Sequence, residues 1–310
     1  MDKCNNVNYF VMIKLTILTE NGQRYSANRL GHEANQLGLA TKLHNPLDAL
    51  TPFTIRDQAP GMVAHRITGI YFDQNDLAYS IMRQQQGDFI FNSPQTLTMW
   101  RDKGMQLAQL ANDEMKIVPT FALRGAVAPE RLDQLESNCA NFLDSPPDQL
   151  SYVVKSVRGC RGIGVNLLHG RNSLYSFLQT IWAIKDQRFL IQPYLPAQKE
   201  YRLFFVRNRL VAALVKQCNG KDFRNNMGRS GATANAPKST LPAEMVTKSL
   251  AAFARTNALY GACDLLQYGD QYYLLEINLV PGFEQMETLS SCNIAKEILL
   301  DALDQYKNLN

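Results

Sequence analysis

The stretch that most constrains this chain lies near its C-terminus, at residues 261–282, GACDLLQYGDQYYLLEINLVPG. Two apolar runs flank a central Gly-Asp pair, a pattern that predicts a β-hairpin. Three oxygen-bearing side chains interrupt these runs, namely Asp264, Glu276 and Asn278. Glu276 and Asn278 are two positions apart on one predicted strand, so their side chains share a face.

The register of this hairpin decides whether the third side chain joins the other two. In a hairpin centred on Asp270, Asp264 lies directly opposite Glu276. That pairing requires an odd-numbered loop or a β-bulge, because a two-residue loop shifts the register by one and turns Asp264 to the other face.

Two carboxylates and a carboxamide on one apolar face are costly to bury without a cation. An all-oxygen donor set suits a hard ion such as Mg²⁺ that is shared with phosphate oxygens. The alternative is a solvated hairpin face. The neighbouring residues on the hairpin are leucines and tyrosines, which favours the cation site.

Composition limits the class of protein. The chain has 310 residues, 45% of them hydrophobic and 19% charged, which is typical of one large or two to three small globular domains. Its net charge is only +4 and no basic run occurs, so we expect no nucleic-acid partner. A locally positive cleft for an anionic substrate remains compatible with this charge.

The cysteines and the N-terminus indicate the compartment. The six cysteines are scattered without a CxxC pair, which argues against a disulfide framework or a zinc site and predicts a cytoplasmic protein. The apolar run at residues 9–18 is broken by Lys14, is too short to span a membrane and lacks a cleavage signal. We therefore expect no membrane partner.

The N-terminal region predicts a parallel α/β sheet. Residues 9–18 have the pattern of a buried strand, residues 26–38 that of an amphipathic helix, and residues 40–43 that of a second strand. Together they form a βαβ unit. Residues 45–92 are ambiguous, except that residues 88–92 suit the last strand of this sheet.

The middle of the chain predicts a long helix and a linker. Residues 92–94 (Asn-Ser-Pro) open a helix whose apolar side continues to Leu110. Lys103 lies on this helix and, from the residues alone, is interpreted as a solvated lysine. Residues 121–150 are polar and predict a linker with a helix.

Residues 152–165 (YVVKSVRGCRGIGV) predict a strand, a glycine-spaced loop and another strand. Lys155 projects from the otherwise apolar first strand, and a buried lysine requires an anion. Phosphate suits the position, because backbone N–H groups of a glycine loop approach it closely. The alternative is a hairpin whose glycines serve the turn. The spacing matches neither the P-loop nor the dinucleotide-binding pattern.

Two further regions carry candidate polar side chains. Glu200 and Arg202 share one face of a predicted hairpin, where they either contribute to a site or form a simple ion pair. Arg224, Asn225 and Asn226 lie in a polar loop that is either solvated or suited to phosphate oxygens.

At this point the segments, taken in order, resemble one family. The chain resembles the ATP-grasp superfamily and, within it, the RimK-like carboxylate–amine ligases, which add glutamate to a ribosomal protein. The resemblance covers nearly the whole chain. The matching segments are residues 25–30, 92–95, 102–103, 154–155, 162–165, 191–194, 200–202, 220–226 and 264–282.

The resemblance implies an ATP-grasp fold of mixed α/β and α+β class. Its parts would be an N-terminal parallel α/β domain at residues 1–94, a central helix and lid at residues 95–190, and a C-terminal antiparallel-sheet subdomain with the metal site at residues 191–310. An adenine nucleotide would lie between the last two.

The resemblance also assigns roles to residues. Lys103 and Lys155 would contact phosphates, with Gly159 and Gly162 in the lid loop. The adenine would meet the connector through the Pro193 carbonyl and the Leu195 N–H, and Glu200 would hold the ribose. The full set implied for the nucleotide is Lys103, Lys155, Gly159, Gly162, Gln192, Pro193, Tyr194, Leu195, Glu200, Arg224, Asn225 and Asn226, and that implied for two Mg²⁺ or Mn²⁺ ions is Asp264, Glu276 and Asn278.

Three departures from the family pattern concern substrate recognition. Pro193 stands where the family usually has glutamate. A proline still offers its backbone carbonyl to the adenine, but any contact from the glutamate side chain is lost. Arg158 and Arg161 make the glycine loop more basic than in relatives. The segment between Tyr194 and Arg202 is about two residues shorter than in RimK itself, which leaves the acid substrate open.

The implied activity is ATP-dependent amide-bond formation through an acyl phosphate. Such transfer depends on charge neutralisation and alignment rather than on a covalent nucleophile. Arg202 and Arg224 are the candidates for stabilising the tetrahedral oxyanion. The partners would be ATP, an amino acid and a peptide, protein or small-molecule acceptor. A non-catalytic ATP-binding module and a homo-oligomeric assembly also stay open.

Overall fold

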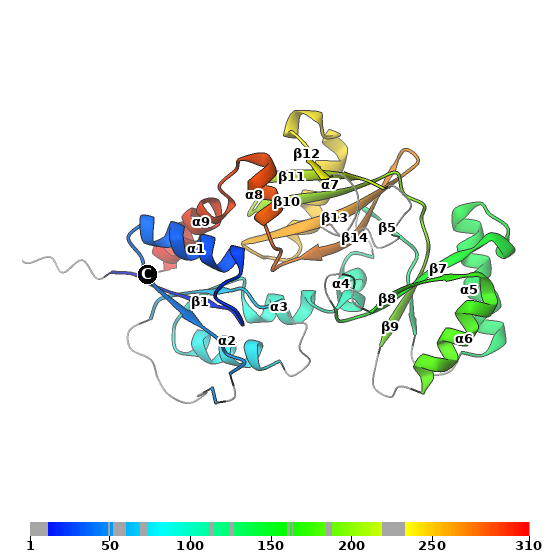
Figure 1. The fold of residues 1–310 in the computed structure, drawn as a ribbon, viewed down its shortest axis with the longest axis horizontal. Coiled ribbons are helices and arrows are strands. Elements are labelled where there is room, and N and C mark those ends of the chain that lie inside the picture. The colour runs from blue at the N-terminus through cyan, green and yellow to red at the C-terminus, as the bar shows by residue number, and fades with distance from the viewer. Residues whose placement is uncertain are drawn as a thin grey trace, which may run out of the picture.

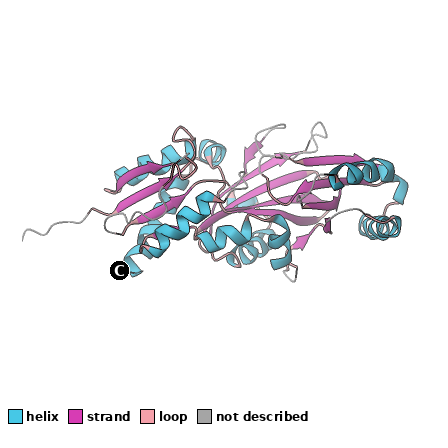
Figure 2. Cartoon of the chain, turned by 90° about the horizontal axis from the view of Figure 1, so that it is seen from below, coloured by secondary structure: helices cyan, strands magenta, loops and turns pink. Residues whose placement is uncertain are grey.

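The computed structural model describes residues 12–48, 50–51, 60–68, 74–111, 114–123, 127–159, 162, 164–183, 188–218 and 233–309. These residues form three sheets along one long axis, with the N-terminal sheet at one end and the lid, which carries α5 (Pro129–Leu143) and α6 (Gly170–Trp182), at the other (Figure 1). Figure 2, turned by 90°, shows the same elongated outline. Among the helices described, none combines the length and apolar character that a membrane crossing requires.

The N-terminal sheet has the order β2-β1-β3-β4, and every pair in it is parallel. The βαβ unit predicted from the sequence is confirmed, although the described part of the first strand begins only at Lys14. Parallel pairing requires crossover helices, which these elements supply. The elements are β1 (Lys14–Leu18), α1 (Tyr25–Gln36), β2 (Ala40–His44), β3 (Met62–His65), α2 (Asn75–Gln85) and β4 (Phe89–Phe91).

Two short helices, α3 (Pro94–Trp100) and α4 (Lys103–Gln109), follow the last strand of this sheet along the chain. The prediction of one continuous helix was wrong. Asp102 has extended backbone angles and its carboxylate accepts hydrogen bonds from the N–H groups of Gly104 and Met105, so it starts a new helix. This break places Lys103 in the first turn of α4.

The lid sheet has the order β6-β9-β7-β8 with antiparallel pairs. Its apolar residues form a cluster of their own around Tyr152 and Leu178. The region predicted as a linker with a helix also contributes a strand, β6, to this sheet. The elements are β6 (Phe121–Leu123), α5 (Pro129–Leu143), the 3₁₀ helix η1 (Pro147–Gln149), β7 (Ser151–Ser156), β8 (Val165–His169), α6 (Gly170–Trp182) and β9 (Phe189–Pro193).

The C-terminal sheet has six strands in the order β12-β11-β10-β13-β14-β5. The two hairpins predicted from the sequence, β10–β11 and β13–β14, form its centre. The elements are β5 (Lys116–Ile117), β10 (Lys199–Val206), β11 (Arg209–Gln217), β12 (Thr233–Asn235), the 3₁₀ helix η2 (Lys238–Thr240), α7 (Ala243–Ala254), β13 (Tyr260–Tyr268), β14 (Gln271–Asn278), α8 (Glu284–Ser290) and α9 (Ile294–Leu309).

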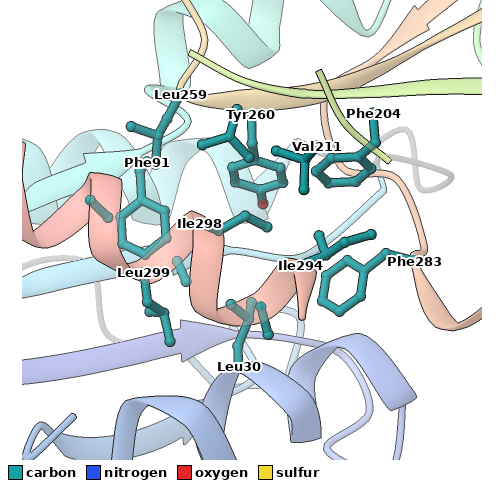
Figure 3. Packing of buried hydrophobic residues seen from close by; sticks show 14 of the residues in the cluster. Leu30, Phe91, Phe204, Val211, Leu259, Tyr260, Phe283, Ile294, Ile298 and Leu299 are labelled. Carbon is teal, nitrogen blue, oxygen red and sulfur yellow. The ribbon is translucent and has the colours of Figure 1, made fainter. Parts of the chain in front are cut away.

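The last helix, α9, joins the first and last sheets in one hydrophobic core. Figure 3 shows Ile298 and Leu299 of α9 between Leu30 of α1 on one side and Tyr260 of β13 on the other. Both sheets therefore pack on the same helix, which fixes their relative position. This packing also positions the two walls of a cleft between the sheets.

Candidate active site

A cleft of about 900 Å³ lies between the N-terminal sheet and the C-terminal sheet. One wall carries predicted site residues from α4, the lid loop, β10 and β14. The other wall comes from the carboxyl ends of β1 and β3, the start of α1, and α8. The polar and charged residues that line it include Thr19, Tyr25, Ser26, Arg66, Arg101, Lys103, Arg202, Glu276, Asn278 and Glu284, and the lid loop contributes Gly159.

The β13–β14 hairpin brings two of the predicted metal ligands together, as predicted. Asp264 pairs with Glu276 and the next residue, Leu265, pairs with Leu274, so Leu275 is the extra residue of a β-bulge in β14. The loop itself has only two residues, so the bulge alone corrects the register. The prediction that a bulge or an odd loop is needed for this pairing is confirmed.

Arg202 neutralises the first of these carboxylates. Its Nε and Nη2 donate to the two oxygens of Asp264 at 2.6 and 2.7 Å, a bidentate geometry. Burial lowers the pKa of Arg202, but attraction to Asp264 outweighs it and the pKa is raised. Of the two alternatives for Glu200 and Arg202, the simple ion pair between them does not form, because β13 places Asp264 directly opposite Arg202.

Lys103 neutralises the second carboxylate. Its Nζ lies 3.3 Å from Glu276 Oε2 and donates to the Gly159 carbonyl at 2.8 Å. The side chain is only 16% exposed, so the interpretation as a solvated lysine was wrong. Lys103 thus connects the lid loop to the hairpin.

Lys155 projects from β7 towards the same carboxylate and is buried, as predicted. Burial lowers its pKa to about 8, although the charge of Glu276 opposes this shift. Burial raises the pKa of Glu276, but the positive charges of Lys103 and Lys155 outweigh it and the pKa is lowered. Two lysines and an ionised carboxylate therefore meet at one point of the site.

The oxygen donors fit a hard divalent ion. Asp264 and Glu276 lie on one face of the hairpin, and Asn278 follows on the same face of β14. Asn278 is fixed by its Oδ1, which accepts from the Val280 N–H at 3.1 Å. Two carboxylates and one amide oxygen make a mixed oxygen set of the kind that hard divalent ions bind.

The connector after β9 presents free backbone groups. The Tyr194 N–H donates to the Ser151 carbonyl at 2.8 Å. Hydrogen-bonded and non-hydrogen-bonded pairs alternate between antiparallel strands, so the neighbouring Tyr152–Pro193 pair is a non-hydrogen-bonded one. The Pro193 carbonyl therefore points away from β7. The Leu195 N–H has no acceptor among the described residues. Gln192 is buried and donates to Thr120 Oγ1 at 2.6 Å.

Glu200 is a buried carboxyl group with one oxygen, Oε2, that has no hydrogen-bond partner in the described part of the chain. Burial, with repulsion from Asp264, raises its pKa to about 8. A buried, incompletely bonded carboxyl group is suited to a hydroxyl-bearing ligand.

For some predicted site residues the structure gives little or no information about contacts. Gly162 belongs to the lid loop and has a left-handed φ of +70°, which glycine adopts without strain. Arg224, Asn225 and Asn226 lie outside the described residues, so their roles stay predictions.

Arg66 and Arg101 line the opposite wall of the cleft and were not predicted from the sequence. Arg101 bonds to Asp76 at 2.6 Å and thereby braces the buried His65. Arg66 directly follows β3, where the carboxyl ends of parallel strands carry ligands in many α/β sheets. The position of Arg66 after a strand could not be recognised from the sequence, because no strand was predicted within residues 45–87.

Comparison with known proteins supports the family. A model of the RimK-like ATP-grasp domain matches residues 101–302. The "Probable alpha-L-glutamate ligase 1" of Shewanella denitrificans is 25% identical over 93% of this chain and 96% of its own length. The "Ribosomal protein bS6--L-glutamate ligase" of an Escherichia coli O81 strain is 26% identical over 93% of this chain and 94% of its own length.

Solved structures support the fold. The ATP-grasp ligase PsnB with a minimal precursor has a TM-score of 0.70 and 14% identity, over 94% of this chain and 99% of PsnB. The ATP complex of D-alanine–D-alanine ligase from Bacillus anthracis has a TM-score of 0.69 and 14% identity, over 96% of this chain and 99% of that one. The predicted fold is confirmed, and the domain match extends over well over half of the sequence. This chain belongs to the RimK-like ATP-grasp family of ligases.

Proposed function

We propose that this protein is a Mg·ATP-dependent carboxylate–amine ligase that adds a glutamate-like amino acid to a peptide or protein acceptor. The observation that carries this proposal is the meeting of Asp264 and Glu276 with Lys103, Lys155 and Arg202 at one end of the cleft. Opposite charges at this density suit a polyphosphate held between cations.

ATP is the first substrate. The free Pro193 carbonyl and Leu195 N–H suit the adenine edge, which offers one donor and one acceptor. Glu200 suits the ribose hydroxyls, because its unbonded Oε2 accepts a hydrogen bond there. Lys103 and Lys155 suit the phosphates, with Gly159 and Gly162 in the loop beside them. Backbone atoms in this loop approach phosphate closely.

Asp264, Glu276 and Asn278 would hold the divalent ions, which we propose to be two Mg²⁺, replaceable by Mn²⁺. When bound, such ions neutralise the charge of the phosphates. The protein's own part is to fix the donors: the bulge aligns Asp264 with Glu276, and Val280 fixes the Asn278 amide.

The chemistry follows from the poor leaving ability of a carboxylate oxygen. An oxygen of the acceptor carboxylate attacks the γ-phosphorus of ATP, and the bond to ADP breaks. The amine of the incoming amino acid then attacks the acyl carbon, and phosphate leaves. Arg202 stands beside the site as a candidate for stabilising the tetrahedral oxyanion, and Arg224 is a second candidate. The lid would exclude the water that hydrolyses the acyl phosphate.

The proposal of a peptide or protein acceptor is supported by the names of similar proteins. One relative is named as a ligase that joins L-glutamate to ribosomal protein bS6, and PsnB was solved with a precursor peptide. Both support a peptide carboxylate as the acid that is activated.

The test is an assay of ADP and phosphate release with Mg·ATP, L-glutamate and a panel of acidic peptides, with mass spectrometry of the peptides. We expect release that depends on the peptide and a mass gain of one glutamate residue. Tight binding of ATP without acceptor-dependent release across a broad panel of peptides and small acids would replace the proposal with a non-catalytic ATP-binding module.

A further inference from the structure

The carboxyl ends of β1 and β3 form a crevice that the nucleotide end of the site does not use. The chain leaves β1 through α1 and returns as β2 on one side, while β3 lies on the other side of β1. Such a reversal of strand order is where open α/β sheets bind ligands. Thr19 follows β1 and Arg66 follows β3, and both line the cleft. The Arg66 N–H donates to the Leu18 carbonyl at 2.9 Å, which holds the two ends together.

Arg66 is a buried cation with no carboxylate partner in the described part of the chain. It is 7% exposed. Its Nη1 donates to the Tyr260 hydroxyl at 3.0 Å and its Nη2 to the Pro281 carbonyl at 2.7 Å. The guanidinium lies 5.5 Å from the Phe283 ring centroid, and its Nε has no hydrogen-bond partner among the residues that the structure describes. A buried charge without a counter-ion is unfavourable, so an anion from outside would stabilise it.

The first turn of α1 presents a second feature that favours an anion. This helix has 12 residues and no acidic residue in its first turn, and no side chain in the described part of the chain caps its N-terminus. The Ala27 N–H turns back to the Arg24 carbonyl at 3.0 Å. The N–H groups of Tyr25 and Ser26 have no acceptor among the described residues, and both residues line the cleft. Free N–H groups and the helix dipole together attract an anion.

Phe283 contacts both Arg66 and the first turn of α1. Its N–H donates to Ser26 Oγ at 3.4 Å, and its ring lies under the Arg66 guanidinium. Its ring centroid is also 6.3 Å from that of Tyr25. Arg66 and the start of α1 are therefore neighbours on one wall of the cleft.

We propose that Arg66 and the first turn of α1 form a subsite for a substrate carboxylate that does not itself react, so that the protein selects a substrate with an additional carboxylate. This inference rests on the proposed ligase function. Pro281, which Arg66 contacts, follows Asn278 by three residues, a span of at most about 10 Å. An acidic peptide end covers this whole span, because each extended residue adds up to about 3.5 Å, whereas a dicarboxylic amino acid covers a shorter one.

The rival explanation is that Arg66 only braces β3 against Pro281 and Tyr260. A brace and a subsite differ in what they change: loss of a brace lowers stability, whereas loss of a subsite weakens the binding of acids. Arg29 on α1 provides the matched control. It is an arginine bonded to Glu287 and Glu33, it joins α1 to α8, and it does not line the cleft.

The experiment measures the dissociation constants of L-glutamate and of a tetrapeptide ending in two glutamates, by calorimetry on the full chain with Mg²⁺ and a non-hydrolysable ATP analogue. We expect Arg66→Met to weaken one of these probes at least tenfold, Arg66→Lys to retain part of the affinity, and Arg29→Met to stay within twofold of wild type. The probe that weakens identifies which substrate the subsite holds. The affinity for the ATP analogue should not change.

A second pair of variants tests the helix. Tyr25→Pro removes one N–H at the first helical position, where proline is tolerated and where Arg24 already has extended backbone angles. Tyr25→Ala removes the side chain but keeps the N–H. We expect a larger loss of affinity for the same probe in Tyr25→Pro than in Tyr25→Ala.

The subsite would be overturned if Arg66→Met bound both probes as wild type does, and a lowered melting temperature in that variant would then show that Arg66 is only a brace. That outcome leaves the ligase proposal intact. If the wild type instead binds the ATP analogue but neither probe, the proposal of acidic substrates fails together with the subsite.

Discussion

At the scale of the residue, each acidic side chain of the candidate metal site already has a cation beside it. Glu276 is held by Lys103 and by the charge of Lys155. Replacing it with neutral glutamine keeps the shape but leaves both lysines without their shared counter-ion and removes a donor for Mg²⁺. We expect Glu276→Gln to lower ADP release at least about 100-fold while the protein stays folded.

The measurement is acceptor-dependent ADP release against Mg²⁺ concentration, with the melting temperature as the test of folding. Glu284→Gln is the control, because Glu284 lines the same cleft without contacting either lysine or Asp264. Near-normal release by Glu276→Gln would contradict the assignment of Glu276 to the metal.

His65, in the N-terminal sheet, predicts a pH dependence of stability. It is completely buried at the end of β3, between Ser80 Oγ at 2.8 Å and Asp76 Oδ2 at 3.0 Å. Burial lowers its pKa from 6.5 to about 4, although Asp76 opposes the shift. The unfolded chain therefore binds a proton more readily than the folded one between these values, and stability is lost as pH falls from 6.5 towards 4.

The expected loss from this residue is up to about 3 kcal/mol in the free energy of unfolding. Urea unfolding at pH 7.0, 5.5 and 4.5 measures it. His65→Gln keeps a polar side chain but does not titrate, so its stability should fall less than that of wild type over the same range. If the free energy of unfolding fell equally with pH in wild type and His65→Gln, a group other than His65 would be the main cause of the pH dependence.

Several single residues were predictable because their signal is local. Asp264, Glu276 and Asn278 interrupt an apolar hairpin, and Lys155 interrupts an apolar strand. The partners of Lys103 and Arg202 were not predictable, because they depend on which strands are neighbours. The pairing of β10 with β13 places Asp264 opposite Arg202, and nothing in either segment alone indicates it.

At the scale of the element, the β13–β14 turn depends on one glycine. Gly269 has a φ of +57° at the first position of a two-residue loop, as a type II′ turn requires. A Cβ there would meet no atom within 4 Å, so the cost of Gly269→Ala is conformational alone. We expect a loss of about 1 kcal/mol in the free energy of unfolding.

Chemical unfolding of the apo protein measures this change. Gly282→Ala is a matched control, since a Cβ at that position also meets nothing within 4 Å and its φ lies outside the strained range. An equal loss in both variants would mean that the turn conformation is not the cause.

Helix boundaries were less predictable than strands. The apolar stripe of residues 94–110 continues across a break, so periodicity indicated one helix. The break follows from Asp102, whose carboxylate caps α4 and also pairs with Arg188 next to the lid. A tertiary contact therefore reinforces a local capping signal that the stripe concealed.

At the scale of the whole molecule, the hydrophobic core is divided in a way that the order of the chain does not suggest. The last helix, α9, packs with residues of the first sheet and of the C-terminal sheet in one cluster, whereas the lid has its own cluster around Leu178. A parallel N-terminal sheet was predictable from local periodicity. The return of the C-terminus to cover it was not, because amphipathic helices carry no signal for the surface they cover.

This division predicts how the molecule responds to a cavity in α9. Ile298 is completely buried between the two sheets (Figure 3), so Ile298→Ala should lower the free energy of unfolding by about 2–5 kcal/mol. Hydrogen exchange followed by mass spectrometry should show faster exchange in β1, β3, β10 and β11 together, and little change in β7 and β9. Leu178→Ala, in the lid cluster, should give the reverse pattern. Faster exchange of the lid in Ile298→Ala, equal to that of the sheets, would mean that all three sheets unfold as one unit and that the lid does not move independently over the nucleotide.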